Sequence, residues 1–234
     1  MALRPLRGMV FVKELMRVLF TPIDLQNWPR GQMFYYFSMM APTGYSMTVN
    51  VDVTELRWAA KEAGVKFFPA YLWLVTKNLN EQMEFKVAER DGVLGYYDTL
   101  TPLYASFHED DHTFSLMWTE YRERFSDFYR LYLANQKQFG AAHGVLCQSQ
   151  TPPPANAYTV SCIPWVQFQH FAVHSHENKP YYFPSVEAGK FFERDGRILM
   201  PLSLTCHHAT TDGWHVSRFL EALNADLSHP EQIL

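Results

Sequence analysis

Segments with strand-like and helix-like patterns alternate along most of this chain, and the alternation limits the folds open to it. Residues 45–53 are rich in β-branched and aromatic side chains, and residues 54–64 then offer a capping threonine, a helical pattern and a terminating glycine. A second helix is predicted over 69–83, which begins with a proline, and a long amphipathic helix over 125–141. Strands that alternate with helices predict a mixed β-sheet with helices packed on it.

Further strands are expected in the middle and the last third of the chain. Residues 92–98, 102–108 and 113–121 have the pattern of hairpin strands, with residues 108–112 as the turn between the last two. The last third contributes strand patterns and a closing helix, over 158–168, 185–206 and 214–227.

The length of 234 residues suffices for one sizeable core, so a single domain is predicted over 21–234. The proline cluster in 148–158 is interpreted as a surface loop, because apolar strands resume on both sides. Residues 1–20 are interpreted as an N-terminal extension. Its apolar stretch is too short for a signal peptide, because three charged side chains interrupt it: Lys13, Glu14 and Arg17.

Composition and charge exclude some classes of function. The net charge is −4 with scattered basic residues, which gives no electrostatic footprint for nucleic acid, and no apolar run approaches the roughly 18 residues of a membrane span. Three irregularly spaced cysteines do not form a disulfide framework, so a reducing cytoplasm is expected. Aromatic residues make up 16% of the chain and must fill a core, a pocket or a subunit interface.

Two histidine clusters suggest metal binding at first sight. Residues 108–112 match the H-E-x-x-H pattern, which binds zinc when a helix places both imidazoles on one face. Here the flanks alternate like strands and the centre is Asp-Asp, so a hairpin turn would aim the two imidazoles apart. The second cluster, which we expect to be solvated or hydrogen-bonded, consists of His170, His174 and His176. No metal site is therefore predicted.

The segment "HHATTDG" (207–213) is a stronger candidate for chemistry, because it follows an apolar strand pattern and precedes a helix. A histidine base needs a fixed tautomer and a fixed orientation, and a turn at a strand end can supply both. Asp212 can brace such a turn, and Gly213 permits a tight backbone. The alternative is that both histidines only make hydrogen bonds within a turn in the core and have no catalytic role.

This segment and four others resemble the chloramphenicol acetyltransferase family, whose signature is H-H-x-x-x-D-G near the C-terminus. "NWPRGQMF" resembles the family's W-x-R element, and "KFFPAYLW" resembles its K-F-Y-P helix start. "YASFHEDDHTFS" resembles the family's hairpin, and "VSCIPWVQFQHF" its S-x-x-P-W-x-x-F-x-x-F stretch. The likeness spans about residues 21–228 and includes the apparent zinc motif.

The resemblance implies an α/β fold of the coenzyme-A-dependent acyltransferase type, an α+β two-layer sandwich with a mixed sheet. It also implies acetyl transfer from acetyl-CoA to a hydroxyl, in a homotrimer whose active sites lie between subunits. His208 would be the general base, with His207 the lesser candidate. Ser161 would donate its hydroxyl to the oxyanion of the intermediate, although by pattern alone it is a strand serine. Asp212 would pair with Arg30 and hold the turn, although by chemistry alone it could be a solvated turn residue.

The resemblance also implies an acceptor pocket, and this chain departs from the family pattern there. The corresponding aromatic residues, any of which could instead belong to the core, are Phe37, Tyr45, Phe114 and Phe171. Glu187 replaces a threonine of the family, and further pocket positions differ at Ala41, Thr43 and Ser175. Glu187 either faces the acceptor or is an outward-facing strand residue. A more polar acceptor than chloramphenicol is therefore an alternative.

Other classes of protein share the H-x-x-x-D-G theme. Dihydrolipoyl acyltransferase cores usually show D-H-R before the aspartate, and plant acyltransferases and condensation domains are about twice this size. A trimeric binding module without catalysis is the remaining alternative. The joint presence of Arg30, Ser161, His208 and Asp212 argues against it.

Overall fold

The computed structural model describes residues 18–148, 152–173 and 181–234. The predicted N-terminal extension lies almost wholly outside these residues. Val18 and Phe20 already pack against the main core, and the first strand, β1 (Phe20–Pro22), begins one residue before the predicted domain start. The domain boundary at residue 21 stays a prediction.

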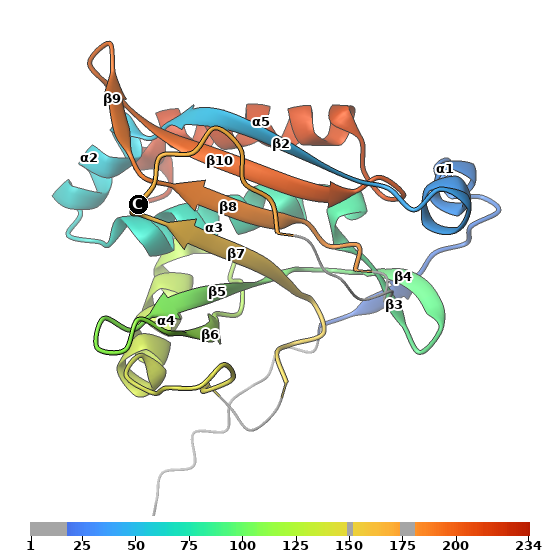
Figure 1. Ribbon diagram of the computed structural model, residues 1–234, viewed down its shortest axis with the longest axis horizontal. Helices are drawn as coiled ribbons and strands as arrows, with labels where there is room; N and C mark the ends of the chain where they lie inside the picture. The colour runs from blue at the N-terminus through green and yellow to red at the C-terminus, as the bar shows by residue number, and fades with distance from the viewer. Residues whose placement is uncertain (1–17, 149–151, 174–180) are drawn as a thin grey trace, which may run out of the picture.

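A mixed sheet of seven strands forms the centre of the molecule (Figure 1), as the sequence predicted. Six strands lie in the order β2 (Gly44–Asp52), β10 (Arg197–His207), β8 (Ser185–Gly189), β7 (Ala157–Ile163), β5 (Thr101–Phe107) and β6 (Phe114–Trp118). The seventh strand, β9 (Phe192–Arg194), pairs with β10. β7 runs parallel to both of its neighbours, and the other pairs are antiparallel.

The predicted hairpin is formed by β5 and β6. The backbone N–H of His108 donates to the carbonyl of Thr113 at 2.9 Å, and the Asp111 side chain accepts from the backbone N–H of Thr113 at 2.9 Å. An aspartate that bonds the backbone two residues later closes a turn in this way. The prediction that residues 108–112 form a turn, not a helix, is confirmed.

A second sheet of three strands lies beside the first. In it, β4 (Val93–Tyr97) lies between β1 and β3 (Val87–Arg90). The strand predicted over 92–98 therefore exists, but its partners are β3 and β1. A Cβ at Gly95 would lie 2.5 Å from the ring of Phe20, so glycine is required for the two strands to approach.

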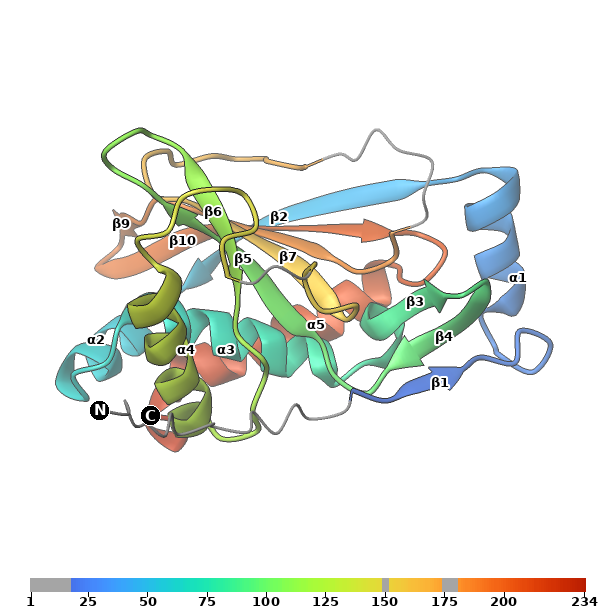
Figure 2. The same ribbon diagram turned by 90° about the horizontal axis from the view of Figure 1, so that it is seen from below.

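Four helices cover one face of the large sheet (Figure 2): α2 (Thr54–Glu62), α3 (Phe67–Asn80), α4 (Phe125–Phe139) and α5 (Gly213–Ser228). α3 is buried along most of its length, which explains why its apolar residues are not confined to one stripe. Short helices complete the chain: α1 (Gly31–Tyr35), η1 (Tyr36–Met40), η2 (Met83–Lys86) and η3 (Pro230–Gln232). Among the described residues, no helix combines the length and apolarity needed to cross a membrane.

The two faces of the large sheet differ in chemistry because strand side chains alternate. Val160, Val186 and Leu204 are buried in the core on the helix-covered face. The register aligns four residues on the opposite face, one in each of β7, β8, β10 and β2, which we call the polar row: Ser161, Glu187, Ser203 and Thr48. Residues 164–173 pass over this row, and the Ser203 hydroxyl donates to the carbonyl of Phe171 at 2.6 Å.

Candidate active site

The turn between β10 and α5 carries the two histidines of the predicted site. β10 ends at His207, and α5 begins at Gly213. Asp212 is the N-cap of α5, and its side chain accepts a hydrogen bond from the backbone N–H of Trp214 at 3.0 Å. The turn is therefore short and fixed at both ends, by a strand on one side and by a capped helix on the other.

Arg30, directly before α1, contacts this turn from the other end of the chain. Its Nη1 donates to Asp212 Oδ2 at 2.6 Å, and its Nη2 donates to the carbonyl of His208 at 3.3 Å. Burial by itself would raise the pKa of Asp212, but hydrogen bonds from Arg30 and His215 outweigh it and lower the pKa to about 2. The carboxylate is thus ionised at neutral pH, and the ion pair joins two distant parts of the chain.

The imidazole of His208 has a tautomer that its partner fixes. Its Nδ1 lies 3.0 Å from the carbonyl oxygen of Thr211. A carbonyl can only accept a hydrogen bond, so Nδ1 carries the proton and Nε2 carries the lone pair. The half-buried ring therefore has a basic nitrogen, Nε2, that can accept a proton from a bound molecule.

Residues from η1 and β2 hold the ring of His208 in place. Phe37 stacks on it with ring centroids 4.0 Å apart, and Tyr45 meets it edge-on at 5.3 Å. The backbone N–H of His208 donates to the carbonyl of Thr43 at 2.8 Å, and the Thr43 hydroxyl donates to the carbonyl of Ala41 at 2.6 Å. The predicted pocket residues Phe37, Thr43 and Tyr45 therefore contact His208, and Ala41 is linked to it through Thr43.

His207 has a different environment from its neighbour. Its Nδ1 accepts a hydrogen bond from the backbone N–H of Ala209 at 3.1 Å, and its ring packs edge-on against Tyr182 at 5.0 Å. Burial, together with the nearby His208, lowers the pKa of His207. This imidazole is held neutral inside the turn, as a structural residue would be.

Ser161 does not lie near His208 within one chain. Ser161 is level with Glu187 on β8, and Glu187 is level with Ser203 on β10, five residues before His208. With about 3.3 Å per residue along a strand and about 4.8 Å between strands, Ser161 and His208 are roughly 19 Å apart.

Glu187 lies beside Ser161 in the polar row and is fully buried. One of its oxygens, Oε1, accepts a hydrogen bond from the Ser185 hydroxyl, while Oε2 is buried with no partner among the described residues. Burial raises the pKa of Glu187 to about 7, although the bond from Ser185 opposes the shift. A substantial fraction of this carboxyl group is therefore neutral at pH 7.

The two remaining aromatic candidates lie on the same side of the sheet as Ser161. Phe114 is opposite Phe107 in the hairpin and is 52% exposed, and Phe107 contacts the exposed Trp165 at 4.7 Å between ring centroids. Phe171 is half-buried in the segment over the polar row. Sequence reasoning missed Phe107, which strand alternation could have indicated, and Trp165, which lies in the turn after β7 where alternation gives no face.

The second histidine cluster is only partly described. His174, Ser175 and His176 lie outside the described residues. His170 lies in the segment over the polar row, where its Nδ1 is 3.3 Å from the hydroxyl of Thr48. Sequence reasoning also missed Thr48 and Ser203, whose hydroxyls are 2.9 Å apart beside Glu187.

Comparison with known families assigns the chain to a protein family. Residues 18–224 match the family model described as chloramphenicol acetyltransferase, which covers most of the chain. The chain belongs to the chloramphenicol acetyltransferase family. It is therefore an acyltransferase, as its motifs predicted.

Relatives and solved structures agree with this assignment. A chloramphenicol acetyltransferase of Clostridium perfringens is 37% identical over 86% of this chain and 91% of its own length. A chloramphenicol acetyltransferase of Staphylococcus aureus is 36% identical over 92% of this chain and 99% of its own length. A solved chloramphenicol acetyltransferase superposes with a TM-score of 0.78 at 27% identity, covering 89% of this chain and all of the other.

More distant structures support the fold alone. A truncated catalytic core of the 2-oxoacid dehydrogenase multienzyme complex from Thermoplasma acidophilum has a TM-score of 0.60 at 16% identity, over 85% of this chain and 95% of that one. The predicted fold of the coenzyme-A-dependent acyltransferase type is confirmed.

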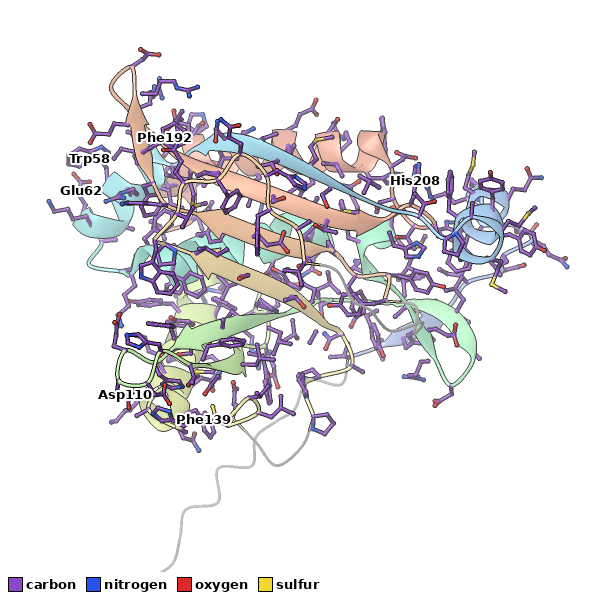
Figure 3. All side chains as sticks on the ribbon, in the orientation of Figure 1. Trp58, Glu62, Asp110, Phe139, Phe192 and His208 are labelled. Carbon is purple, nitrogen blue, oxygen red and sulfur yellow. The ribbon has the colours of Figure 1, made fainter. Side chains whose placement is uncertain are left out.

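In this acyltransferase, the predicted site residues form two groups. We call the first the His208 group, which comprises His208, Phe37, Tyr45, Arg30 and Asp212. It lies at the end of the sheet next to α1, where Figure 3 labels His208. We call the second the Ser161 group, which comprises Ser161, Glu187, Phe114 and Phe171, on the face of the sheet away from the helices.

Proposed function

We propose that this acyltransferase moves an acetyl group from acetyl-CoA to a hydroxyl of a small acceptor, with His208 as the general base. The fixed tautomer of His208 carries the proposal: Thr211 holds the proton on Nδ1, so Nε2 is free to take one from the acceptor. The names of the relatives make chloramphenicol the first acceptor to test.

The chemistry follows from these positions. The acceptor hydroxyl gives its proton to Nε2 of His208 while its oxygen attacks the thioester carbonyl. The resulting oxyanion accepts a hydrogen bond from the Ser161 hydroxyl, which stabilises the tetrahedral intermediate. The intermediate collapses with loss of the coenzyme A thiolate, which recovers the proton from the His208 imidazolium. The ion pair of Arg30 and Asp212 positions the base and takes no proton itself.

The separation of the two groups supports sites shared between subunits. His208 and Ser161 are too far apart to act on one acceptor within a chain, so Ser161 would come from a neighbouring subunit. Both ends carry exposed apolar side chains suited to such a contact, among them Met39 and Met40 near the His208 group and Phe114 and Trp165 near the Ser161 group. Contact between two different surfaces forms a ring where the rotation between subunits closes, and a ring of three would be the homotrimer implied by the resemblance.

Glu187 supports a second candidate acceptor. Its Oε2, which has no partner in the described part of the chain, lies in the polar row beside Ser161, where a hydroxyl-rich or cationic acceptor would supply a hydrogen bond or a positive charge. The same acetyl transfer would then act on an acceptor more polar than chloramphenicol. The free state of all three cysteines suits action in a reducing cytoplasm.

One assay tests these proposals together. Purified protein and acetyl-CoA are incubated with chloramphenicol, with hydroxyl-rich acceptors and with amine-bearing alcohols, and free thiol is measured. Thiol release with chloramphenicol supports the first candidate, and release only with the polar acceptors supports the second. Binding of acetyl-CoA without thiol release for any acceptor would contradict both and favour a binding module. Light scattering on the same sample tests the trimer, which an active monomer would contradict.

A further inference from the structure

Three potential metal ligands converge at the tip of the β5–β6 hairpin, at the opposite end of the sheet from His208. The side chains are those of His108, Asp110 and His143, and one ligand atom from each lies within 4.8 Å of the other two. Figure 3 labels Asp110 at this tip and His208 at the far end of the molecule. The acyl transfer described above makes no use of this cluster.

The tautomer of His108 is fixed by a chain of two hydrogen bonds. The Ser115 hydroxyl donates its one proton to the carbonyl of Ala142 at 2.9 Å. Its oxygen must then accept from Nε2–H of His108, which is 2.8 Å away. His108 is buried and its Nδ1 is left with the lone pair, so the ring is oriented as a neutral metal ligand is.

His143 is oriented in the same manner by a carboxylate. Its Nδ1 lies 2.9 Å from Asp111 Oδ2, and an ionised carboxylate only accepts, so Nδ1 carries the proton. The other oxygen of Asp111 accepts from the backbone N–H and the hydroxyl of Thr113, which fixes this carboxylate in turn. When His143 is neutral, the lone pair of its Nε2 faces Asp110 Oδ2 at 3.3 Å, and a cation between these two acceptors would stabilise the arrangement. When His143 is protonated, its Nε2–H donates to Asp110 instead, and a metal ion competes with that proton.

The geometry points to a binding site for a divalent transition-metal ion at His108 Nδ1, His143 Nε2 and the carboxylate of Asp110. Two imidazoles and one carboxylate form a ligand set typical of zinc, with water in the remaining position. Ligand atoms separated by at most 4.8 Å lie about 2.8 Å or less from a common centre, so each must move inward by roughly 0.7 Å to reach zinc distances. The rings of His108 and His143 are stacked with centroids 4.1 Å apart, so binding the ion requires the half-exposed His143 to shift out of this stack and lengthen its bond to Asp111.

This site differs from the one that the H-E-x-x-H pattern suggests. His112 has a positive φ of 56°, its ring packs against Phe107, and it is not part of the cluster. The second histidine is His143, which follows α4. The expectation that no metal binds was based on the hairpin alone, whereas the fold adds a ligand from a segment distant in sequence. A bound ion would tie the hairpin turn to that segment.

Zinc binding to the full chain, freed of metal by a chelator, tests the site. We expect one Zn²⁺ per chain by calorimetry with micromolar affinity, and a melting temperature several degrees higher with excess zinc, because the ion binds only the folded state. His143→Ala and Asp110→Asn remove exposed ligands and are expected to weaken zinc binding by about 10-fold or more. His112→Ala, on the same turn, is the matched control and is expected to bind zinc like wild type. Acetyl transfer by each variant verifies that it is folded.

Two results would overturn the site. If wild type shows no binding and no thermal shift at about 100 μM zinc, the cluster is only an ion pair between His143 and its two aspartates. If His143→Ala and Asp110→Asn bind zinc as tightly as His112→Ala does, zinc binds elsewhere on the chain. Absorption of bound Co²⁺ supplies a second measurement, since nitrogen ligands from two histidines give a spectrum that His143→Ala is expected to lose.

Discussion

The His208 group and the Ser161 group differ in how far one chain satisfies their polar atoms. In the His208 group, Asp212 is paired with Arg30 and the proton of His208 Nδ1 is bonded to a backbone carbonyl. In the Ser161 group, Glu187 is fully buried, yet Oε2 has no partner among the described residues. Among the described residues, the polar atoms named in the His208 group are paired, whereas Glu187 Oε2 in the Ser161 group is not.

From this difference we expect His208 to act in the chemical step and Glu187 to act in the choice of acceptor. A base must be held in one orientation before the acceptor arrives, and the His208 turn meets this condition with contacts inside the chain. A buried acceptor atom without a partner costs free energy, and the bound acceptor is the group that can relieve that cost. Substitutions in the His208 group should therefore change the rate for every acceptor, whereas changes at Glu187 should depend on the acceptor.

The largest effect is expected for His208→Ala. Removal of the base should lower turnover by about 10²–10⁴-fold for every acceptor, the range expected when general base catalysis is lost. The ring also stacks on Phe37, so kcat is compared per folded protein, and the loss of turnover should far exceed any loss of stability. The measurement is kcat for thiol release with chloramphenicol and with a polar acceptor.

His207→Ala is the matched control, because it removes the neighbouring imidazole from the same turn. Its ring packs on Tyr182, so we expect loss of stability with kcat largely kept in the folded fraction. The reverse outcome, turnover retained by the His208 variant and lost by the His207 variant at equal folding, would transfer the role of base to His207.

Ser161→Ala is expected to have the next largest effect. Loss of an oxyanion donor lowers kcat by about 10²-fold or more, while binding of acetyl-CoA should be nearly unchanged. Thr159→Ala, two residues earlier on the same face of β7, is the control and should keep full activity. Equal activity of the two variants would remove Ser161 from the chemical step.

A sharper test of sharing mixes two inactive proteins. Homotrimers of His208→Ala and of Ser161→Ala each lack half of every site, but mixed trimers contain sites with an intact half from each chain. Denaturation and refolding of the two variants together should restore a substantial fraction of wild-type activity. No recovery, with mixed trimers verified by mass, would contradict sites shared between subunits.

Asp212→Asn should act on stability first. Leaving Arg30 without its partner should lower the free energy of unfolding by about 1–3 kcal/mol, less than for a fully buried pair because Asp212 is 35% exposed. Since the folded-state pKa of Asp212 is about 2, below its unfolded value near 3.9, this stabilisation is complete above about pH 4 and is lost as pH falls toward 2. Urea unfolding at several pH values measures the difference between wild type and variant.

The surface pair of Arg218 and Glu221 provides the comparison for Asp212. Its side chains are 60% and 69% exposed, so Glu221→Gln should cost less than about 0.5 kcal/mol. If Asp212→Asn unfolds at the same urea concentration as Glu221→Gln, the pair with Arg30 does not hold the turn.

The sequence predicted those parts of the fold that local patterns determine. The β5–β6 hairpin followed from alternation on both sides of an Asp-Asp turn, and α2, α3 and α4 followed from helical patterns. The predicted capping role of Thr54 is wrong, because Thr54 is the first residue of α2 and its side chain makes no cap hydrogen bond. β1 has only three residues, too few for a period to be visible, and its pairing with β4 depends on distant contacts. The three-stranded sheet could therefore not be predicted from sequence patterns.

The same distinction applies to the site. The turn at 207–213 was visible because its strand, its histidines and its N-cap follow one another in sequence. The burial of Glu187 could not be predicted in this way. Strand alternation gives the face on which Glu187 lies, but the segment 164–173 that covers this face is irregular. The convergence of His143 on His108 was also hidden, since α4 separates the two along the chain.

The effect most informative on the acceptor is expected at Glu187. Its folded-state pKa of about 7 lies above the unfolded value near 4.3, so the folded state binds more protons between these pH values. Stability should therefore fall as pH rises from about 4.5 to about 7, by roughly 2–3 kcal/mol at most. Glu187→Gln keeps the shape of the side chain but cannot ionise, so its stability should lack this decline.

The kinetics of Glu187→Gln complete the test. An ionised carboxylate about 4 Å from a developing oxyanion would repel it by roughly 4 kcal/mol at an effective dielectric constant of 20, and the neutral form would not. With chloramphenicol, we compare kcat/KM of Glu187→Gln with kcat/KM of wild type at each pH. The ratio of variant to wild type should rise as pH passes about 7. The rise should be about 10-fold if the carboxylate and the oxyanion are more than about 4 Å apart or partly screened. With an amine-bearing acceptor the ratio should fall instead, because the ionised carboxylate attracts the ammonium group. If the ratio stays constant with pH for both acceptors, Glu187 lies outside the acceptor site. The unpaired oxygen of the Ser161 group would then have no role in the choice of acceptor.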